Sequence, residues 1–358
     1  MSTLTVPHAA FCIDSPVLSV TPLGNGHINS TYLLETQSGE RYTLQKINRK
    51  VFTQPDQVMA NIEKVTAHIR KKDPDPRAAL TVIPANNGRL LYEDEAGECW
   101  RTYRFIPDSL CLDSAASPED FYQSGVGFGS FQRALADFPA DTLYETIPRF
   151  HDTENRFRQM REAIERDKAG RAKSVQKEIE FFLAREKDAR ILTALTKEGV
   201  LPLRVTHNDT KLNNVLLDAK TRKALCVIDL DTVMPGLSVH DFGDSIRFGA
   251  STAAEDEPDL SKVHLDMDLF TAYTKGFLSA CGQDLTRAEV DKMVQGARMM
   301  TMECGVRFLA DHLNGDVYYR IARPGHNLDR ARTQMRLIEE MEARFDECNA
   351  IVHAVAGR

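Results

Sequence analysis

Hydrophobic residues in the first third of the chain come in short runs separated by turns that contain glycine. Two strand-like runs joined by such a turn predict a β-hairpin. The strand-like runs cover residues 17–22, 31–36, 41–47, 80–84, 90–92 and 99–106. One segment between them differs, because Val58, Ile62, Val65 and Ile69 recur at spacings of four, three and four. That period predicts an amphipathic helix within residues 55–71.

The rest of the chain has the longer period that is typical of helices. Gly125, Gly127 and Gly129 fall within one such segment, where the lack of side chains allows close packing. The segment of residues 203–231 interrupts the helical pattern and carries two further short strands. The helical patterns cover residues 119–138, 156–167, 173–197, 265–280, 287–313 and 329–355.

The two patterns meet at Pro107. We therefore predict an α+β protein with two lobes. Residues 1–106 would form a small lobe around an antiparallel sheet, and residues 107–358 a large, mainly helical lobe.

Composition narrows the functional classes. The chain has 358 residues, of which 42% are hydrophobic, so it can bury a sizeable core. Its formal net charge of -7 argues against a nucleic-acid-binding surface, which needs a basic field. Its 7 cysteines are scattered without metal-ligand spacing, which indicates reduced thiols and no zinc site.

The first ten residues lack the charged and apolar regions of a signal peptide. No apolar run reaches the length of about 18 residues that is needed to span a membrane. We expect a cytoplasmic protein that does not enter a membrane. Because nothing in the sequence demands a partner chain, we expect a monomer.

The candidate chemistry lies within residues 203–231. The string His207-x-Asp209-x-x-x-x-Asn214 is followed fifteen residues later by Asp229, which ends an apolar strand. Phosphoryl transfer needs one carboxylate beside the attacking hydroxyl and hard oxygen ligands that hold Mg²⁺ on the phosphates. On their own, an Asp and an Asn at this spacing could simply belong to a turn. The full string with the following strand indicates a kinase site. We expect His207 to brace the loop. Asp231 could hold a metal through water or order the loop.

This string resembles the catalytic loop and metal-binding aspartate of the protein-kinase-like superfamily. Its form is similar to that of the aminoglycoside phosphotransferase and choline kinase group. Over almost the whole chain the sequence resembles the N-acetylhexosamine 1-kinases. The stretches that carry this resemblance are Gly24 to Asn29, Arg204 to Asn214, Ile228 to Pro235, Asp241 to Gly249 and Thr301 to Leu309.

The resemblance implies a bilobal kinase-like fold. It also implies that the γ-phosphoryl group of ATP is transferred to the anomeric C1 hydroxyl of N-acetylgalactosamine or N-acetylglucosamine, with Mg²⁺ as the metal. Asp209 would then be the catalytic base and contact the acceptor, and Asn214 and Asp229 would be the Mg²⁺ ligands.

Glycines in the Gly24-Asn25-Gly26 loop could let backbone N–H groups approach the phosphates. A kinase-like small lobe usually carries a lysine on its third strand that pairs with a helix glutamate. Here Gln45 occupies that position, and Lys46 comes one residue late and would face the other side. Either a bulge turns Lys46 toward Glu63, or Gln45 touches the nucleotide and the cation comes from elsewhere. The candidate nucleotide-binding residues are Gly24, Gly26, His27, Asn29, Gln45 and, at the hinge, Phe105.

An Asp-Phe-Gly string begins at Asp241, twelve residues after Asp229. We interpret Asp241 as a brace for the catalytic loop and not as the metal ligand. Glu303 and Arg307, four residues apart on a predicted helix, could form an ion pair or line a sugar pocket. The candidate acceptor-binding residues are Asp209, Asp244, Arg247, Phe248, Glu303 and Arg307.

Other nucleotide folds are unsupported, because the sequence lacks both a P-loop and a G-x-G-x-x-G that opens a helix after a strand. Two alternatives remain open. One is a kinase of the same superfamily that acts on another hydroxyl acceptor, such as homoserine, choline, methylthioribose or an aminoglycoside. The other is a nucleotide-binding regulator that has lost catalysis.

Overall fold

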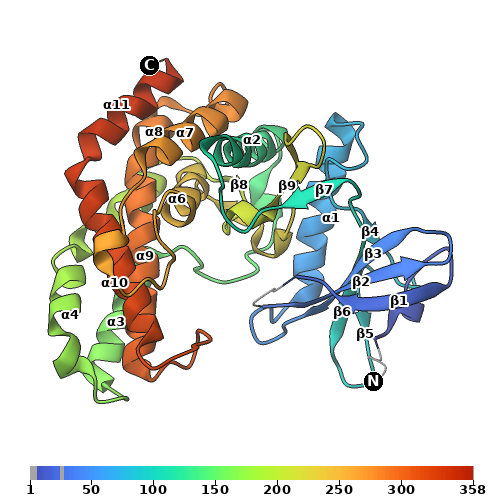
Figure 1. The fold of residues 1–358 in the computed structure, drawn as a ribbon, viewed down its shortest axis with the longest axis horizontal. Helices are drawn as coiled ribbons and strands as arrows, with labels where there is room; N and C mark the ends of the chain where they lie inside the picture. The colour runs from blue at the N-terminus through green and yellow to red at the C-terminus, as the bar shows by residue number, and fades with distance from the viewer. Residues whose placement is uncertain (1–5, 25–27, 358) are drawn as a thin grey trace.

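An antiparallel sheet forms one end of the molecule, and stacked helices form the other (Figure 1). This computed structural model describes residues 6–24 and 28–357. The predicted α+β class, with a small sheet lobe and a large helical lobe, is confirmed. β6 of the small lobe ends at Arg104, and the next strand, β7, pairs with β9 of the large lobe. We therefore propose residues 106 and 107 as the division between the lobes.

The small-lobe sheet has the strand order β1-β2-β3-β6-β4, with β5 pairing on β6. The helix α1 forms where the sequence predicts it, because Val58, Ile62, Val65 and Ile69 make one buried stripe. The elements of this lobe are η1 (His8–Ala10), β1 (Val17–Pro22), β2 (Ser30–Thr36), β3 (Arg41–Ile47), α1 (Pro55–Lys72), β4 (Val82–Ile83), β5 (Tyr92–Glu93) and β6 (Cys99–Arg104).

The large lobe combines helices with two short sheets, β10-β9-β7 and β11-β8. Its strands are β7 (Ser109–Cys111), β8 (Arg204–Thr206), β9 (Val215–Asp218), β10 (Ala224–Val227) and β11 (Met234–Gly236). Its helices are α2 (Pro118–Ala134), α3 (Thr153–Arg166), α4 (Gln176–Leu183), α5 (Ile191–Lys197), α6 (Ser238–Gly249), α7 (Met267–Cys281), α8 (Arg287–Asp291), α9 (Met293–Asn314), α10 (His326–Ala343) and α11 (Phe345–Ala356). Short 3-10 turns connect them: η2 (Ala140–Thr142), η3 (Ala172–Val175), η4 (Glu186–Arg190), η5 (Leu212–Asn214), η6 (Leu230–Thr232) and η7 (Leu260–Lys262).

The helix α2 packs closely on α7, as its glycines predict. A Cβ atom on Gly125 would lie 2.5 Å from the carbonyl oxygen of Tyr273. On the facing helix, a Cβ atom on Gly276 would lie 2.1 Å from the carbonyl oxygen of Tyr122. Both neighbours are backbone atoms, so the two helices can only approach this closely without side chains at these points.

Several long helical predictions are wrong in their continuity. Residues 173–197 form two short helices and two 3-10 turns, because the chain changes direction at Arg185, whose N–H bonds the Phe182 carbonyl at 2.9 Å. The patterns at 287–313 and 329–355 are each divided as well, near Lys292 and Arg344. Segment 203–231 holds three strands where two were predicted.

The two lobes are tied together behind the site. Asn61 of α1 is fully buried, and its side-chain amide donates to the carbonyls of Tyr144 (2.8 Å) and Val233 (2.9 Å) of the large lobe. The segment between α2 and α3, which contains Tyr144, runs between the lobes (Figure 1). Among the described residues, none of the helices combines the length and the apolar character that crossing a membrane requires.

Candidate active site

A β-hairpin brings the predicted metal ligands together. Asn214 directly precedes β9 and Asp229 comes two residues after β10, and the ends of these antiparallel strands pair at Val215 and Val227. The Ile228 N–H donates to the Asn214 carbonyl at 2.9 Å, which continues the pairing beyond the strands. Asp229 itself adopts a left-handed conformation (φ 58°). The hairpin therefore places the candidate ligands on adjoining backbone.

His207 braces the loop through both ring nitrogens. Its Nε2 donates to the Ile228 carbonyl at 2.9 Å, so its Nδ1 carries the lone pair that accepts from the Asp209 N–H at 3.2 Å. The ring is buried and packs edge-on against Phe128 and Phe131 of α2. His207 is thus fully used in holding the loop, in agreement with the sequence-based interpretation.

Asp241, at the start of α6, holds the same loop from the other side. Its Oδ2 accepts from the His207 N–H (2.9 Å) and from the Gln132 side chain (2.7 Å), and its Oδ1 accepts from the Asn208 N–H (2.8 Å). Burial raises the pKa of this carboxyl, while the donors around it favour the ionised form. Asp241 therefore acts as the predicted brace.

The glycine of the Asp-Phe-Gly string has a packing role. A Cβ atom on Gly243 would lie 2.5 Å from the Gly296 carbonyl oxygen of α9. Phe242 of the same string is fully buried and packs on the rings of α7. The string at 241–243 is thus explained by the crossing of α6 and α9 and by the loop brace.

Asp209 carries a lysine partner that the sequence analysis did not single out. Lys211 Nζ lies 2.9 Å from Asp209 Oδ1 and 3.3 Å from Oδ2. Burial alone would raise the pKa of Asp209, but the ammonium of Lys211 holds it below its ordinary value. The carboxylate of Asp209 is therefore ionised and points toward a cation within its own loop.

Asn214 and Asp229 fit a site for Mg²⁺. The amide nitrogen of Asn214 donates to the Asp209 carbonyl at 2.8 Å, which leaves its side-chain oxygen free to face a metal. Burial and the neighbouring carboxylates of Asp231 and Asp209 raise the pKa of Asp229 to about 6, so this carboxylate lies in excess negative charge that a cation would neutralise. Among the described residues there is no group of three His, Cys, Asp or Glu side chains that could hold a metal. The side-chain oxygens of Asn214 and Asp229 would supply two ligands, and phosphates and water would complete the coordination. Such a site suits Mg²⁺, which keeps several non-protein ligands.

Both oxygens of Asp231 are engaged by the small lobe. Asn29 Nδ2 donates to Oδ2 at 2.6 Å, and Arg101 Nη1 donates to Oδ1 through a short, buried ion pair. These contacts support the ordering one of the two roles that were open for Asp231. Arg101 was not found from the sequence, because the pairing of β6 with β3 that brings it here is a long-range contact.

The candidate nucleotide-binding residues surround this ion pair only in part. Asn29 and Gln45 lie beside it, since Gln45 Oε1 accepts from Arg101 Nε at 2.9 Å. Gly24 has the positive φ of 69° that glycine favours, whereas the predicted Gly26 and His27 lie outside the described residues. Phe105 is separate: it packs against Arg41 and lines a cavity of about 640 Å³ with residues of the 75–81 segment.

The lysine–glutamate pair of kinase-like folds does not form. Lys46 points to the other face of the sheet, where its Nζ lies 3.4 Å from Glu98. Glu63 of α1 instead lies 3.7 Å from Arg70. The first of the two arrangements left open by the sequence is therefore wrong, and Gln45 faces inward toward Arg101.

On the acceptor side, His151 connects α9 to the catalytic loop. Its Nδ1 lies 2.9 Å from Glu303 Oε1, and its Nε2 lies 3.1 Å from the Asn208 carbonyl. Both neighbours are acceptors, so only the doubly protonated ring satisfies both. Burial would lower the pKa of His151, but Glu303 raises it above its ordinary value. The Thr153 hydroxyl donates to the second carboxylate oxygen of Glu303. Glu303 is fully buried, so it can act on the cleft only through His151.

Of the two arrangements left open for Glu303 and Arg307, the ion pair does not form, because Glu303 pairs with His151 instead. The Arg307 guanidinium lies 5.6–5.9 Å from the ring centroids of three aromatic residues. It has no carboxylate within 4.0 Å in the described part of the chain. The three rings are those of Phe150, Tyr318 and Tyr319.

The remaining acceptor-side candidates lie on α6. Asp244 accepts from the Thr210 N–H at 3.0 Å and from Arg247 Nε at 3.0 Å. Arg247 also bonds Glu255 at 2.6 Å and lies 5.9 Å from the Phe248 ring centroid. Asp244 and Arg247 are buried and paired, so they order the floor of the site beneath Thr210.

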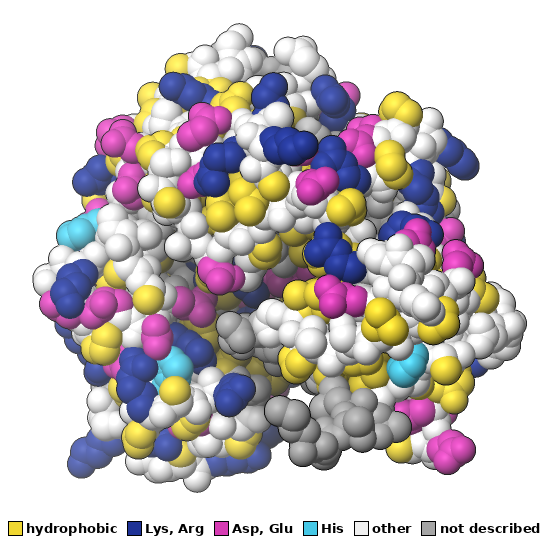
Figure 2. Space-filling model, turned by 45° about the vertical axis from the view of Figure 1, so that its right-hand side comes forward, with side chains coloured by type: hydrophobic (Ala, Val, Ile, Leu, Met, Phe, Trp, Pro, Cys, Tyr) yellow, Lys and Arg dark blue, Asp and Glu magenta, His cyan; other side chains and the backbone are white. Residues whose placement is uncertain are grey.

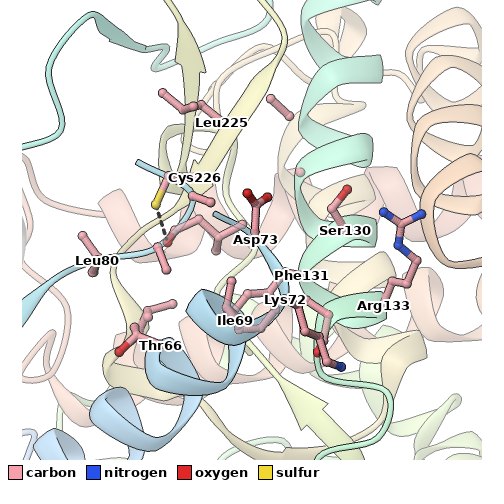
Figure 3. Close-up of a pocket in the computed structure, with 17 residues that line it drawn as sticks. Thr66, Ile69, Lys72, Asp73, Leu80, Ser130, Phe131, Arg133, Leu225 and Cys226 are labelled. Carbon is pink, nitrogen blue, oxygen red and sulfur yellow. Dashed lines mark hydrogen bonds between the residues drawn. The ribbon is translucent and has the colours of Figure 1, made fainter. Parts of the chain in front are cut away.

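The molecule is hollowed where the two lobes meet, and both acidic and basic side chains lie in this hollow (Figure 2). A separate cavity of about 350 Å³ lies between α1, α2 and β10. Leu225 and Cys226 form one wall and Ser130 and Arg133 lie opposite (Figure 3). None of the candidate site residues lines that cavity.

The family model described as "APH: Phosphotransferase enzyme family" matches residues 19–273. Among solved structures, the chain is similar to a microcompartment-associated aminopropanol kinase, with 16% identity, a TM-score of 0.63 and coverage of 95% of this chain and 96% of the other. It is also similar to an aminoglycoside phosphotransferase from Alicyclobacillus acidocaldarius (13% identity, TM-score 0.63, coverage 99% and 98%). A third similar structure is an amicoumacin kinase in complex with AMP-PNP and Ca²⁺ (12% identity, TM-score 0.59, coverage 91% and 88%). At these identities the likeness shows a shared fold.

Proposed function

Because the chain belongs to the phosphotransferase enzyme family, we propose that it is an ATP-dependent kinase that phosphorylates the anomeric C1 hydroxyl of N-acetylgalactosamine or N-acetylglucosamine. The kinase chemistry is supported above all by Asp209. Its ionised carboxylate stands in a loop that is fixed from two sides, by His207 and by Asp241, beside the oxygen donors of Asn214 and Asp229.

In the proposed reaction the C1 oxygen attacks the γ-phosphorus and the bond from that phosphorus to the bridging oxygen of ADP breaks. Asp209 orients the hydroxyl and receives its proton. Lys211 makes Asp209 a weak base, which suits a loose transition state in which positioning matters more than early proton removal. Asn214 and Asp229 would hold Mg²⁺, which neutralises charge on the phosphates.

ATP would lie beneath the small-lobe sheet, with its adenine at the hinge. The residues proposed to contact it are Gly24, Gly26, His27, Asn29, Gln45 and Phe105. The complex of the similar amicoumacin kinase with AMP-PNP and Ca²⁺ supports the use of a triphosphate with a divalent metal.

The charges near the acceptor side favour a neutral acceptor over a cationic one. A cationic acceptor calls for free carboxylates or free aromatic faces. Here Glu303 is paired with His151 and Asp244 with Arg247, and the rings around Arg307 already face a guanidinium. An acetamido sugar offers carbonyl and hydroxyl oxygens to Arg307. We therefore rank an N-acetylhexosamine above choline or an aminoglycoside, with Arg307, Phe248, Asp244, Arg247 and Glu303 forming or ordering its pocket.

An acceptor panel tests this proposal. Purified protein with Mg-ATP would be given N-acetylgalactosamine, N-acetylglucosamine, the non-acetylated amino sugars, homoserine, choline and an aminoglycoside, with ADP release and ³¹P NMR of the products as readouts. We expect the 1-phosphate of an N-acetylhexosamine. A product phosphorylated at C6 would refute the 1-kinase assignment but not the kinase assignment. Binding of Mg-ATP without transfer to any acceptor would favour the catalytically silent regulator.

Substitution of Arg307 tests the pocket separately. We expect Arg307→Met to raise the KM for the sugar about 10-fold or more while the KM for ATP stays within about twofold, as for loss of one charge-assisted contact. The exposed Arg320, thirteen residues away, offers a matched control in Arg320→Met. Equal effects of the two substitutions would remove Arg307 from the acceptor site.

A further inference from the structure

The small lobe lacks its usual phosphate-binding lysine, but it has a buried cation on the neighbouring strand. β3 and β6 are antiparallel, and Gln45 pairs directly with Arg101. Directly paired residues project from the same face of a sheet. The Arg101 side chain therefore stands on the face where a lysine at position 45 would point. Lys46, which pairs with Trp100, projects from the opposite face.

Arg101 is buried more completely than a surface ion pair would require. It is 1% exposed, and its pKa is raised by Asp231 against the effect of burial. Its Nε donates to Gln45 and its Nη1 to Asp231, with Met59 Sδ 4.0 Å from Nη1. Within the described residues, Nη2 makes no hydrogen bond. A guanidinium carries five N–H donors, so Nη2 can donate to an acceptor that a ligand supplies.

The position of Asp231 shows where that acceptor would come from. Asp231 stands two residues after Asp229 and is held from its other side by Asn29, which follows the Gly24-to-Gly26 loop. Arg101 and Asn29 thus meet at Asp231, two residues from the candidate metal ligand, and this is where we expect the phosphates of a bound nucleotide.

We propose that Arg101 binds the α- and β-phosphates of ATP in place of the usual strand lysine, and that Asp231 of the large lobe holds it in position in place of the usual helix glutamate. This inference rests on the proposed function, since it assumes a nucleotide in the cleft. It differs from an ordinary kinase-like site in that the positioning ion pair joins the two lobes. Closure of the lobes and assembly of the phosphate site are then a single event.

Nucleotide binding separates this inference from the choice of acceptor, because no acceptor is needed. Calorimetry with Mg-ADP and, separately, with adenosine would be run on the wild type and on Arg101→Met. We expect Mg-ADP binding to weaken about 10- to 100-fold, as for loss of a charge-assisted phosphate contact. Adenosine binding should change less than about threefold, because adenosine carries no phosphate. Lys46→Met, on the other face of the sheet, is the matched control and should bind both ligands as the wild type does.

The single variant leaves Asp231 buried without its partner and could fail to fold. The double variant Arg101→Met/Asp231→Asn removes both charges and keeps the test available. Gln45→Lys, added to Arg101→Met, restores a cation at the usual position and should recover most of the Mg-ADP affinity. Wild-type affinity for Mg-ADP in the folded double variant, or an equal loss for adenosine and Mg-ADP, would overturn the proposal. Failure of the wild type itself to bind Mg-ADP would overturn the proposed function as well.

Discussion

Replacing Asp241 by asparagine tests the claim that this carboxylate braces the catalytic loop on one side. In the wild type, three N–H groups donate to it, from His207, Asn208 and the Gln132 side chain, at 2.7–2.9 Å. Asparagine keeps one acceptor oxygen and replaces the other with a donor. Gln132 can adapt to that change by rotating its amide, because its Oε1 is buried without a hydrogen-bond partner. One backbone N–H of the loop then remains unpaired.

The expected cost follows from that count. A hydrogen bond to a charged group contributes about 1.5–3 kcal/mol, and an unpaired buried donor costs about 1–3 kcal/mol. Burial raises the pKa of this carboxyl, so removing its charge from the interior offsets part of that loss of stability. We expect Asp241→Asn to lower the free energy of unfolding by about 2–4 kcal/mol. Because Asp209 follows the two braced residues directly, kcat should fall about 100-fold, as for a displacement near 1 Å.

Urea unfolding and steady-state kinetics on the same preparations measure both effects. Gln132→Leu in the wild-type and Asp241→Asn backgrounds completes a double-mutant cycle. If Gln132 rescues the asparagine, the two changes will be coupled by about 1 kcal/mol or more. A loss of less than about 0.5 kcal/mol for Asp241→Asn, with normal kcat, would refute the bracing argument.

Three further predictions concern single groups. Burial and the neighbouring His151 lower the pKa of His240 from 6.5 to about 3, so below pH 6.5 only the unfolded chain takes up this proton and stability falls as the pH drops. His240→Phe should therefore reduce the loss of unfolding free energy between pH 6.5 and 4.5 by about 2 kcal/mol in urea titrations, and an unchanged pH slope would contradict this. Gly125→Ala should destabilise the protein by about 1–3 kcal/mol in thermal or urea unfolding, because its Cβ meets the backbone of α7; a neutral effect would show that the helices separate freely. Lys211→Met should raise the pKa that governs kcat, because Asp209 loses its partner, and an unshifted pH–rate profile would separate Lys211 from the function of Asp209.

Much of the fold could be predicted from patterns within single segments of the sequence. The stripe from Val58 to Ile69 predicts α1, and the strand runs predict β1 to β3 within a residue or two, because both follow from spacing within one segment. The breaks near Arg185 and Arg344 could not be predicted, because they depend on how each helix meets its neighbours and not on its own composition.

The candidate site divides in the same way. Asp209, Asn214 and Asp229 are close in sequence and joined by one hairpin, so their spacing was sufficient to bring them together. Arg101 depends on the register between β3 and β6, and the His151–Glu303 pair joins positions 152 residues apart. Neither contact leaves a local signal, and both became visible only when the chain was folded.

The most direct test of the central claim is phosphoryl transfer by the wild type and by Asp209→Ala with Mg-ATP and an N-acetylhexosamine, followed by ³¹P NMR. The account predicts ADP and hexosamine 1-phosphate in equal amounts from the wild type. It predicts that Asp209→Ala folds and binds Mg-ADP, and that its turnover falls about 10²- to 10⁴-fold. A folded Asp209→Ala variant with near-normal turnover would contradict the mechanism and place the chemistry elsewhere in the molecule.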